Sequence, residues 1–148
     1  MNVSVTSSVM IADGPVFSLA MDLAPESYTV AAVTLDAGTT RIVALTPESA
    51  VPILLAVRAT TESGNTPHVT IQPNPGSGSG TPALELTVDS VLLICGAEVL
   101  QSVGTPRSLG VKNLGSEPVT VDILACLDLP KKPEPLHKDP SNPPTAQS

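Results

Sequence analysis

The sequence predicts an all-β domain built as a sandwich or a barrel. Apolar and polar residues alternate along many short segments, and proline or glycine stands in most of the gaps between them. These segments recur about every 8–12 residues, a spacing typical of antiparallel sandwiches and barrels. Helical periodicity is scarce, and a length of 148 residues suits one domain.

Ten segments are expected to form strands. The first alternates apolar residues with Ser and Thr, the signal of a half-buried strand, and Asp13-Gly14-Pro15 ends it as a turn. The ten predicted strands cover residues 3–11, 16–23, 28–35, 39–45, 51–60, 69–72, 84–88, 91–95, 109–114 and 119–127. Residues 96–102 have room for a short helix. The Asn and Gly within 112–117 predict a hairpin loop before the last strand.

Two segments carry no strand signal. Residues 73–82 read PNPGSGSGTP, which predicts a flexible loop. The segment 130–148 contains six prolines in 19 residues. Proline lacks the N–H that a sheet ladder needs and favours an extended, polyproline-like path. We therefore expect a β-sandwich domain over 1–129 and an extended Pro-rich C-terminal tail over 130–148.

The charge balance argues against nucleic acid as a partner. The chain has 14 acidic and 7 basic residues, a net charge of −7. Residues 1–129 hold 12 acidic and 4 basic residues, so the body alone carries −8. Phosphate backbones are bound by clustered Lys and Arg, which this body does not offer.

No membrane partner and no secretion are expected. The N-terminus lacks the basic and long apolar regions of a signal peptide, and no apolar run reaches the roughly 20 residues that a transmembrane helix needs. With no Trp, one Phe and one Tyr, the core must be built from small aliphatic side chains. Each of these buries less area than an aromatic ring, which favours further burial in a homo-oligomer.

No constellation of residues indicates catalysis, a metal or a cofactor. His68 and His137 lie in no metal-binding spacing, and the carboxylates are scattered at turns and strand ends. Cys95 and Cys126 lie in apolar runs without Cys-x-x-Cys spacing, so two buried, reduced thiols are expected, with a disulfide as the alternative. Residues 76–80 lack the Gly-Lys-Ser/Thr of a phosphate loop. The sequence therefore predicts a protein that is not an enzyme.

The stretches SVLLI at 90–94, VKNLG at 111–115 and VTV at 119–121, with the acidic balance, Gly-Ser loop and tail, resemble the capsid decoration or cement proteins of tailed bacteriophages. The resemblance implies a jelly-roll-like antiparallel β-sandwich with an extended Pro-rich C-terminal arm. It also implies a virion protein, made in the host cytoplasm, that sits on the capsid surface as a dimer or trimer. There it would clamp neighbouring major capsid proteins, with no catalytic, cofactor or metal residues.

Two other functions stay open at this point. One is a different phage structural part, such as a head-fibre base, collar or tail protein. The other is a non-catalytic ligand- or carbohydrate-binding β-sandwich module, although sugar sites commonly use aromatic rings and this chain has two.

For a capsid protein, weak contacts repeated over a lattice multiply through effective concentration, and an extended arm adds contact area. The tail is therefore expected to bind a neighbouring subunit through Lys131, Lys132, Pro133, Pro135 and Leu136.

Overall fold

The computed structural model describes residues 1–47, 49–76 and 84–129. The predicted tail, 130–148, and most of the Gly-Ser loop lie outside these described residues.

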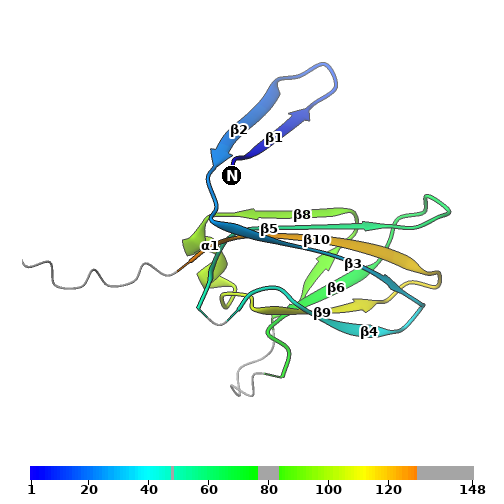
Figure 1. The fold of residues 1–148 in the computed structure, drawn as a ribbon. Helices are drawn as coiled ribbons and strands as arrows, with labels where there is room; N and C mark the ends of the chain where they lie inside the picture. Colours follow the sequence, from blue (N-terminus) through cyan, green and yellow to red (C-terminus); the bar gives the residue numbers. More distant parts are fainter. Residues whose placement is uncertain (48, 77–83, 130–148) are drawn as a thin grey trace, which may run out of the picture.

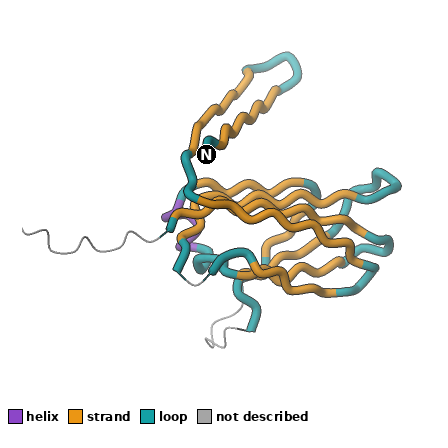
Figure 2. Tube along the Cα trace, viewed as in Figure 1, coloured by secondary structure: helices purple, strands orange, loops and turns teal. Residues whose placement is uncertain are grey.

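The described chain forms strands almost throughout, with one short helix (Figures 1 and 2). The strands are β1 (Val3–Met10), β2 (Val16–Leu23), β3 (Ser27–Leu35), β4 (Thr40–Ala44), β5 (Val51–Thr60), β6 (Val69–Pro73), β7 (Leu86–Val88), β8 (Val91–Cys95), β9 (Ser108–Asn113) and β10 (Val119–Asp128). The helix α1 covers Ala97–Ser102, where the sequence left room for one. The boundaries of all ten strands agree with the prediction to within a few residues.

Strands β3 to β10 form a sandwich of two four-stranded antiparallel sheets. The upper sheet of Figure 1 has the order β3-β10-β5-β8, and the lower sheet has the order β4-β9-β6-β7. Most successive strands cross from one sheet to the other, and the first and last strands of this body lie side by side. Eight strands wound in this way form a jelly roll. The predicted jelly-roll-like antiparallel β-sandwich is therefore confirmed.

One local prediction is wrong. Residues 112–117 were expected to close a hairpin, but β9 lies in the lower sheet and β10 in the upper sheet. The segment is instead a crossing between the sheets. The Asn-Gly signal does predict a tight turn: the Gly115 N–H donates to the side-chain oxygen of Asn113 at 2.9 Å. A turn signal of this kind does not reveal whether the next strand pairs with the previous one or faces it.

The core lies between the sheets and is aliphatic, as the composition predicts. The inward positions alternate along each strand, such as Leu109 and Val111 in β9 and Val121 and Ile123 in β10, and all four are at most 1% exposed. The two aromatic residues, Phe17 and Tyr28, are both exposed. The chain therefore exposes both of its aromatic side chains and uses neither in the core.

The N-terminal strands form a separate element. β1 and β2 pair only with each other in an antiparallel hairpin, in register from Val3–Leu23 to Met10–Val16. The hairpin stands off the end of the sandwich (Figures 1 and 2). The chain is fixed directly after it: Pro25 is buried, and the Glu26 N–H donates to the carbonyl of Leu127 at 3.1 Å. The sandwich therefore begins at β3, inside the predicted 1–129 body.

Candidate interaction surface

The hairpin has one apolar and one mostly polar face, because successive side chains of a strand point to opposite sides. The register places eight residues on the first face, which we call the hairpin face: Val3, Val5, Ser7, Val9, Phe17, Leu19, Met21 and Leu23. On the opposite face the hydroxyl of Ser4 donates to the carboxylate of Asp22 at 2.6 Å. The alternation predicted for this segment is therefore real.

The half of the hairpin face nearer the tip is open to solvent. Near the sandwich, Val3, Val5, Met21 and Leu23 are half-buried. Toward the tip, Val9 is 56%, Phe17 69% and Leu19 45% exposed. A two-stranded hairpin is marginally stable by itself, and three strands or packing against another element are needed for independent stability. The exposed apolar face is therefore a candidate interaction surface.

The outer side of the upper sheet is also apolar. The strand register places Val30, Leu124, Ala56 and Leu93 in one row across all four strands. Their sequence neighbours point inward and pack on the core, which puts this row on the outside. Val30 is 65% and Leu93 40% exposed.

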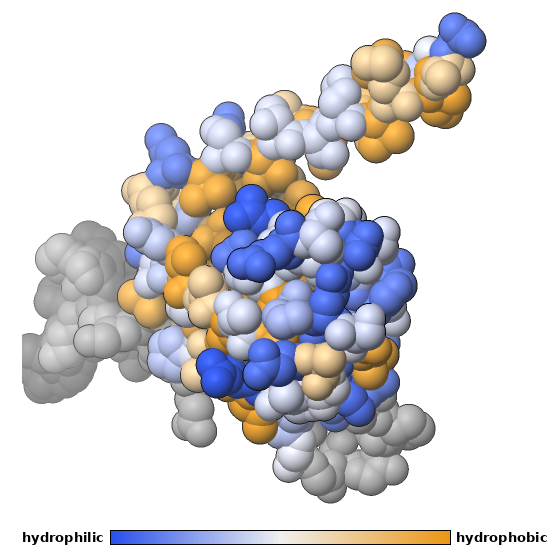
Figure 3. Space-filling view, turned by 90° about the vertical axis from the view of Figure 1, so that its right-hand side faces the viewer, coloured by the Kyte–Doolittle hydropathy of each residue, from blue (hydrophilic) through white to orange (hydrophobic). Residues whose placement is uncertain are grey.

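Two exposed residues flank this row. Tyr28 precedes Val30 by one step on the same face, and Val91 precedes Leu93 in β8; they are 53% and 64% exposed. The outer patch is defined by Tyr28, Val30, Ala56, Val91, Leu93 and Leu124. Figure 3 shows hydrophobic side chains on the hairpin and on the side of the body below it.

A shallow hollow of about 310 Å³ marks part of the outer patch. Val30, Val91 and Leu124 line it, together with the ion pair between Arg58 and Asp122. The Nη2 and Nε atoms of Arg58 lie 2.9 and 3.3 Å from the same carboxylate oxygen. The two charges neutralise each other, so the patch has no net charge at this edge.

The outer side of the lower sheet differs. Its outward positions carry mostly polar or small residues: Thr40, Ile42, Ala44, Thr70, Gln72, Thr87, Ser108, Gly110 and Lys112. Ile42 is the one large apolar residue among them, and it is 64% exposed. An isolated exposed apolar residue is ordinary, whereas a contiguous group indicates an interaction surface.

The two cysteines lie on the outer side of the upper sheet and are unpaired. Leu54 of β5 stands between Cys126 of β10 and Cys95 of β8 in one row. Two interstrand spacings amount to about 9.6 Å, beyond the roughly 7 Å that a disulfide spans between Cα atoms. Burial raises the pKa of both thiols, and the charge of Cys95 raises that of Cys126 further. The prediction of unpaired thiols is confirmed, but that of two buried core thiols holds only in part: Cys126 is buried, Cys95 is half-buried, and neither lies in the core between the sheets.

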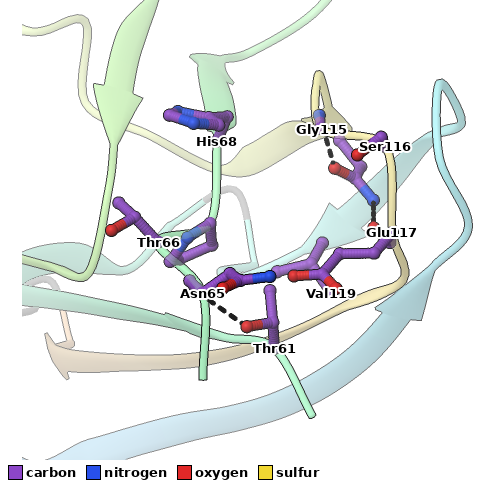
Figure 4. Close-up of a pocket in the computed structure, with 10 residues that line it drawn as sticks. Thr61, Asn65, Thr66, His68, Gly115, Ser116, Glu117 and Val119 are labelled. Carbon is purple, nitrogen blue, oxygen red and sulfur yellow. Dashed lines mark hydrogen bonds between the residues drawn. The ribbon is translucent and has the colours of Figure 1, made fainter. Parts of the chain in front are cut away.

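A second, polar hollow lies between loops at the far end of the sandwich (Figure 4). It has a volume of about 220 Å³ and includes Thr61, Asn65, His68, Asn113 and Glu117 in its lining. The buried Asn113 amide donates to the carbonyls of Leu35 and Glu117 at 3.1 and 2.8 Å.

The charged groups around this hollow do not converge on a reaction centre. The Ser63 hydroxyl lies 2.7 and 2.8 Å from the two oxygens of the Glu117 carboxylate. His68 points Nδ1 toward Asp89 at 3.7 Å, with both side chains 62% exposed. The Ser63–Glu117 hydrogen bonds join the loop after β5 to the turn before β10.

The predicted partner-binding residues Lys131, Lys132, Pro133, Pro135 and Leu136 lie outside the described residues, as does His137. Among the residues that the structure describes, no group of three or more His, Cys, Asp or Glu is placed to hold a metal. No helix in the described ranges is long and apolar enough to cross a membrane.

The sequence did contain a signal for the outer patch. In 91–95 and 123–127 apolar residues occupy both phases of the strand, a pattern typical of strands covered on both sides. The alternation likewise predicts which residues share the hairpin face, once 3–10 and 16–23 are known to pair with each other.

No family model matches the chain, and no curated protein matches it. Among solved structures, the crystal structure of the Yersinia pseudotuberculosis-derived mitogen is similar over 75% of this chain and 93% of that chain. The identity is 15% and the TM-score 0.45, so this likeness carries no argument about function.

Proposed function

We propose that the protein is a virion structural protein, a capsid decoration or cement protein that binds the outside of a phage head. In this role it clamps neighbouring major capsid proteins and works as a homo-oligomer, a dimer or trimer. It acts through its surfaces and not through catalysis.

The observation that supports this proposal best is the pairing of a rigid body with an exposed apolar arm. Phe17, 69% exposed at the far end of the hairpin, belongs to the hairpin face, a candidate interaction surface. The outer patch adds further exposed apolar residues, including Val30 and Val91. Apolar surface of this kind marks contact with other proteins.

The fold suits a contact protein. The inner residues of both sheets form one core to which the hairpin contributes no residue, so the body is a rigid unit without the hairpin. Weak contacts made many times on one particle add up through effective concentration. The acidic body, with four basic residues in 1–129, favours protein over packaged nucleic acid as the partner.

The test is immunogold electron microscopy. An antibody raised against this chain is applied to phage particles from the source that carries the gene. Label spread over the whole head supports a decoration protein. Label confined to one vertex or to the tail supports the head-fibre, collar or tail alternative, and particles without label overturn both.

A truncation after Leu129 tests the tail separately. If Lys131, Lys132 and the prolines that follow bind the lattice, the truncated chain occupies fewer sites on particles than the full chain does. Equal occupancy of the two chains overturns the proposed role of the tail while leaving the role of the body intact.

A further inference from the structure

The hairpin face and the outer patch are two exposed apolar surfaces of one chain. We propose that they bind each other between copies: the hairpin of one molecule lies on the outer side of the upper sheet of a second molecule. This deepens the self-association part of the proposed function and does not depend on what the assembled protein coats.

The two surfaces match in chemistry. The hairpin face contains one polar side chain, Ser7, among eight residues. The outer patch contains Tyr28 as its one polar-tipped member, and the adjacent Arg58–Asp122 pair is internally neutralised. Neither surface offers a charge that would need a counter-ion in the partner. Aliphatic groups on both sides gain by leaving water together.

The two surfaces also match in size. Eight residues of β1 or β2 span about 27 Å at 3.4 Å per residue, and two paired strands are about 10 Å wide. The upper sheet, with four strands and up to ten residues in β5 and β10, is large enough to receive this ribbon. An exchange of two hairpins along their full length covers four such faces, about 1,100 Å² in total, which clears the roughly 1,000 Å² that a biological interface needs.

The hairpin is held away from its own sheet. Only Ala24 separates the end of β2 from the buried Pro25, and proline has a fixed φ. Glu26 is fixed on both sides: its N–H donates to Leu127, and its carboxylate accepts from the Leu129 N–H at 3.1 Å. In Figure 1 the hairpin leads away from the upper sheet. A second copy is therefore the favoured occupant.

The first test compares oligomeric mass by light scattering over a range of concentrations. Phe17→Glu places a charge on the hairpin face, and Ser18→Glu places the same charge on the opposite, exposed face of the same strand. Val30→Glu changes the outer patch, and Ile42→Glu is the matched control on the lower sheet, with 64% against 65% exposure.

The wild type and both controls are expected to be oligomeric. Phe17→Glu and Val30→Glu are each expected to weaken association by about a hundredfold or more, because an unpaired carboxylate would be buried in an apolar contact. Leu93→Glu replaces Val30→Glu if that variant fails to fold, as judged by circular dichroism. A monomeric wild type, or an oligomer that tolerates both substitutions, overturns the proposal.

Mixing the two defective variants is the sharper test. The Val30→Glu chain keeps a native hairpin, and the Phe17→Glu chain keeps a native outer patch. If the contact is between molecules, an equimolar mixture forms a complex that neither variant forms alone. Because a mixed pair keeps one of the two contacts, it is expected to be weaker than the wild type, and a mixture that associates no more than either variant alone overturns the proposal.

The two proposals fail separately. A chain that is monomeric in solution but labels phage heads overturns the hairpin exchange and leaves the decoration role standing. A chain that exchanges hairpins but labels no particle does the reverse.

Discussion

The outer sides of the two sheets occupy equivalent positions in the jelly roll, yet their chemistry differs. The lower sheet presents threonines, Gln72 and Lys112, with Ile42 as a single large apolar exception. The upper sheet presents Val30, Val91 and other apolar residues in contiguous rows. The inner sides of both sheets are alike, because they share one core.

This difference separates two uses of apolar residues. A sandwich folds once its inner faces are covered, so the polar outer side of the lower sheet is sufficient for a stable body. The exposed apolar residues on the outer side of the upper sheet, such as Val30 and Val91, lie outside that core and present area that water disfavours. The proposed contact with the hairpin face of a second copy would cover this area.

The largest expected effect comes from an outward position of the upper sheet that is already covered. Leu54 points outward with Cys126 and Cys95, yet it is 1% exposed. Leu54→Ala is expected to lower the free energy of unfolding by about 2–5 kcal/mol, as in a core. Ile42→Ala, at an outward position of the lower sheet, is expected to change it by less than about 0.5 kcal/mol.

Urea denaturation of both variants measures this contrast. The comparison should be made at a concentration low enough for the chain to be monomeric, so that association does not add to the measured stability. Equal losses for Leu54→Ala and Ile42→Ala would contradict the difference between the two outer sides.

The second prediction concerns Asn113, a buried polar residue at the end of β9 in the lower sheet. Asn113 is 1% exposed; its side-chain amide donates to the carbonyls of Leu35 and Glu117 and accepts from the Gly115 N–H. Asn113→Ala leaves two carbonyls and one N–H without this partner, at an expected cost of about 1–3 kcal/mol in unfolding free energy. Asn65→Ala, on an exposed loop, is the control. A loss for Asn113→Ala no larger than for Asn65→Ala would show that solvent replaces these bonds.

The third prediction uses the thiols of the upper sheet. Burial raises the pKa of Cys95 and Cys126, and the thiolate is the reactive form. Both are therefore expected to react with a thiol reagent more slowly in the folded chain than in urea, and faster as the pH rises. Cys126 should react last, because it is fully buried and Cys95 raises its pKa further. Mass spectrometry of the labelled peptides gives the order, and equal rates in the folded chain would contradict it.

The raised pKa of Cys95 and Cys126 also makes the stability of the fold depend on pH. Because the folded chain holds these thiol protons more tightly than the unfolded chain, the thiols contribute stability at neutral pH. That contribution is lost as the pH rises past the ordinary thiol pKa and through the raised value.

Strand positions and fold class were predictable because alternation and Pro/Gly punctuation are local signals. These signals predict strands over 91–95 and 119–127, and the structure has β8 and β10 there. The pairing of strands was not predictable in this way. The turn at 112–117 looks like a hairpin loop, and only the position of β10 beside β3 and β5 shows that it crosses between sheets.

The interaction surface was missed for a related reason. Alternation in 3–10 shows which side chains share a face, but it carries no information on whether that face is covered. Val5 and Val9 have the same phase, and one is half-buried while the other is 56% exposed. Coverage depends on where the hairpin leaves the sandwich, and Glu26 fixes that point through hydrogen bonds to Leu127 and Leu129, about a hundred positions away.

The smallest expected effect lies at the edge of the outer patch. Arg58 and Asp122 form an exposed ion pair, with side chains 65% and 35% exposed. Pairs of this kind contribute about 0–1 kcal/mol to folding and are screened by salt. Arg58→Ala is therefore expected to change the unfolding free energy of the monomer by no more than about 1 kcal/mol, and less at high salt.

The same substitution should have a larger effect on self-association than on the unfolding free energy of the monomer. A hairpin that covers the outer patch removes water from the pair, and Arg58→Ala would leave Asp122 as a buried, unpaired carboxylate. The double variant Arg58→Ala/Asp122→Ala leaves no charge and is expected to associate at least as well as the wild type. If Arg58→Ala and the double variant associate equally, the ion pair lies outside the covered area, and the hairpin must lie nearer Tyr28, which pairs with Cys126 on the other side of the Val30 row.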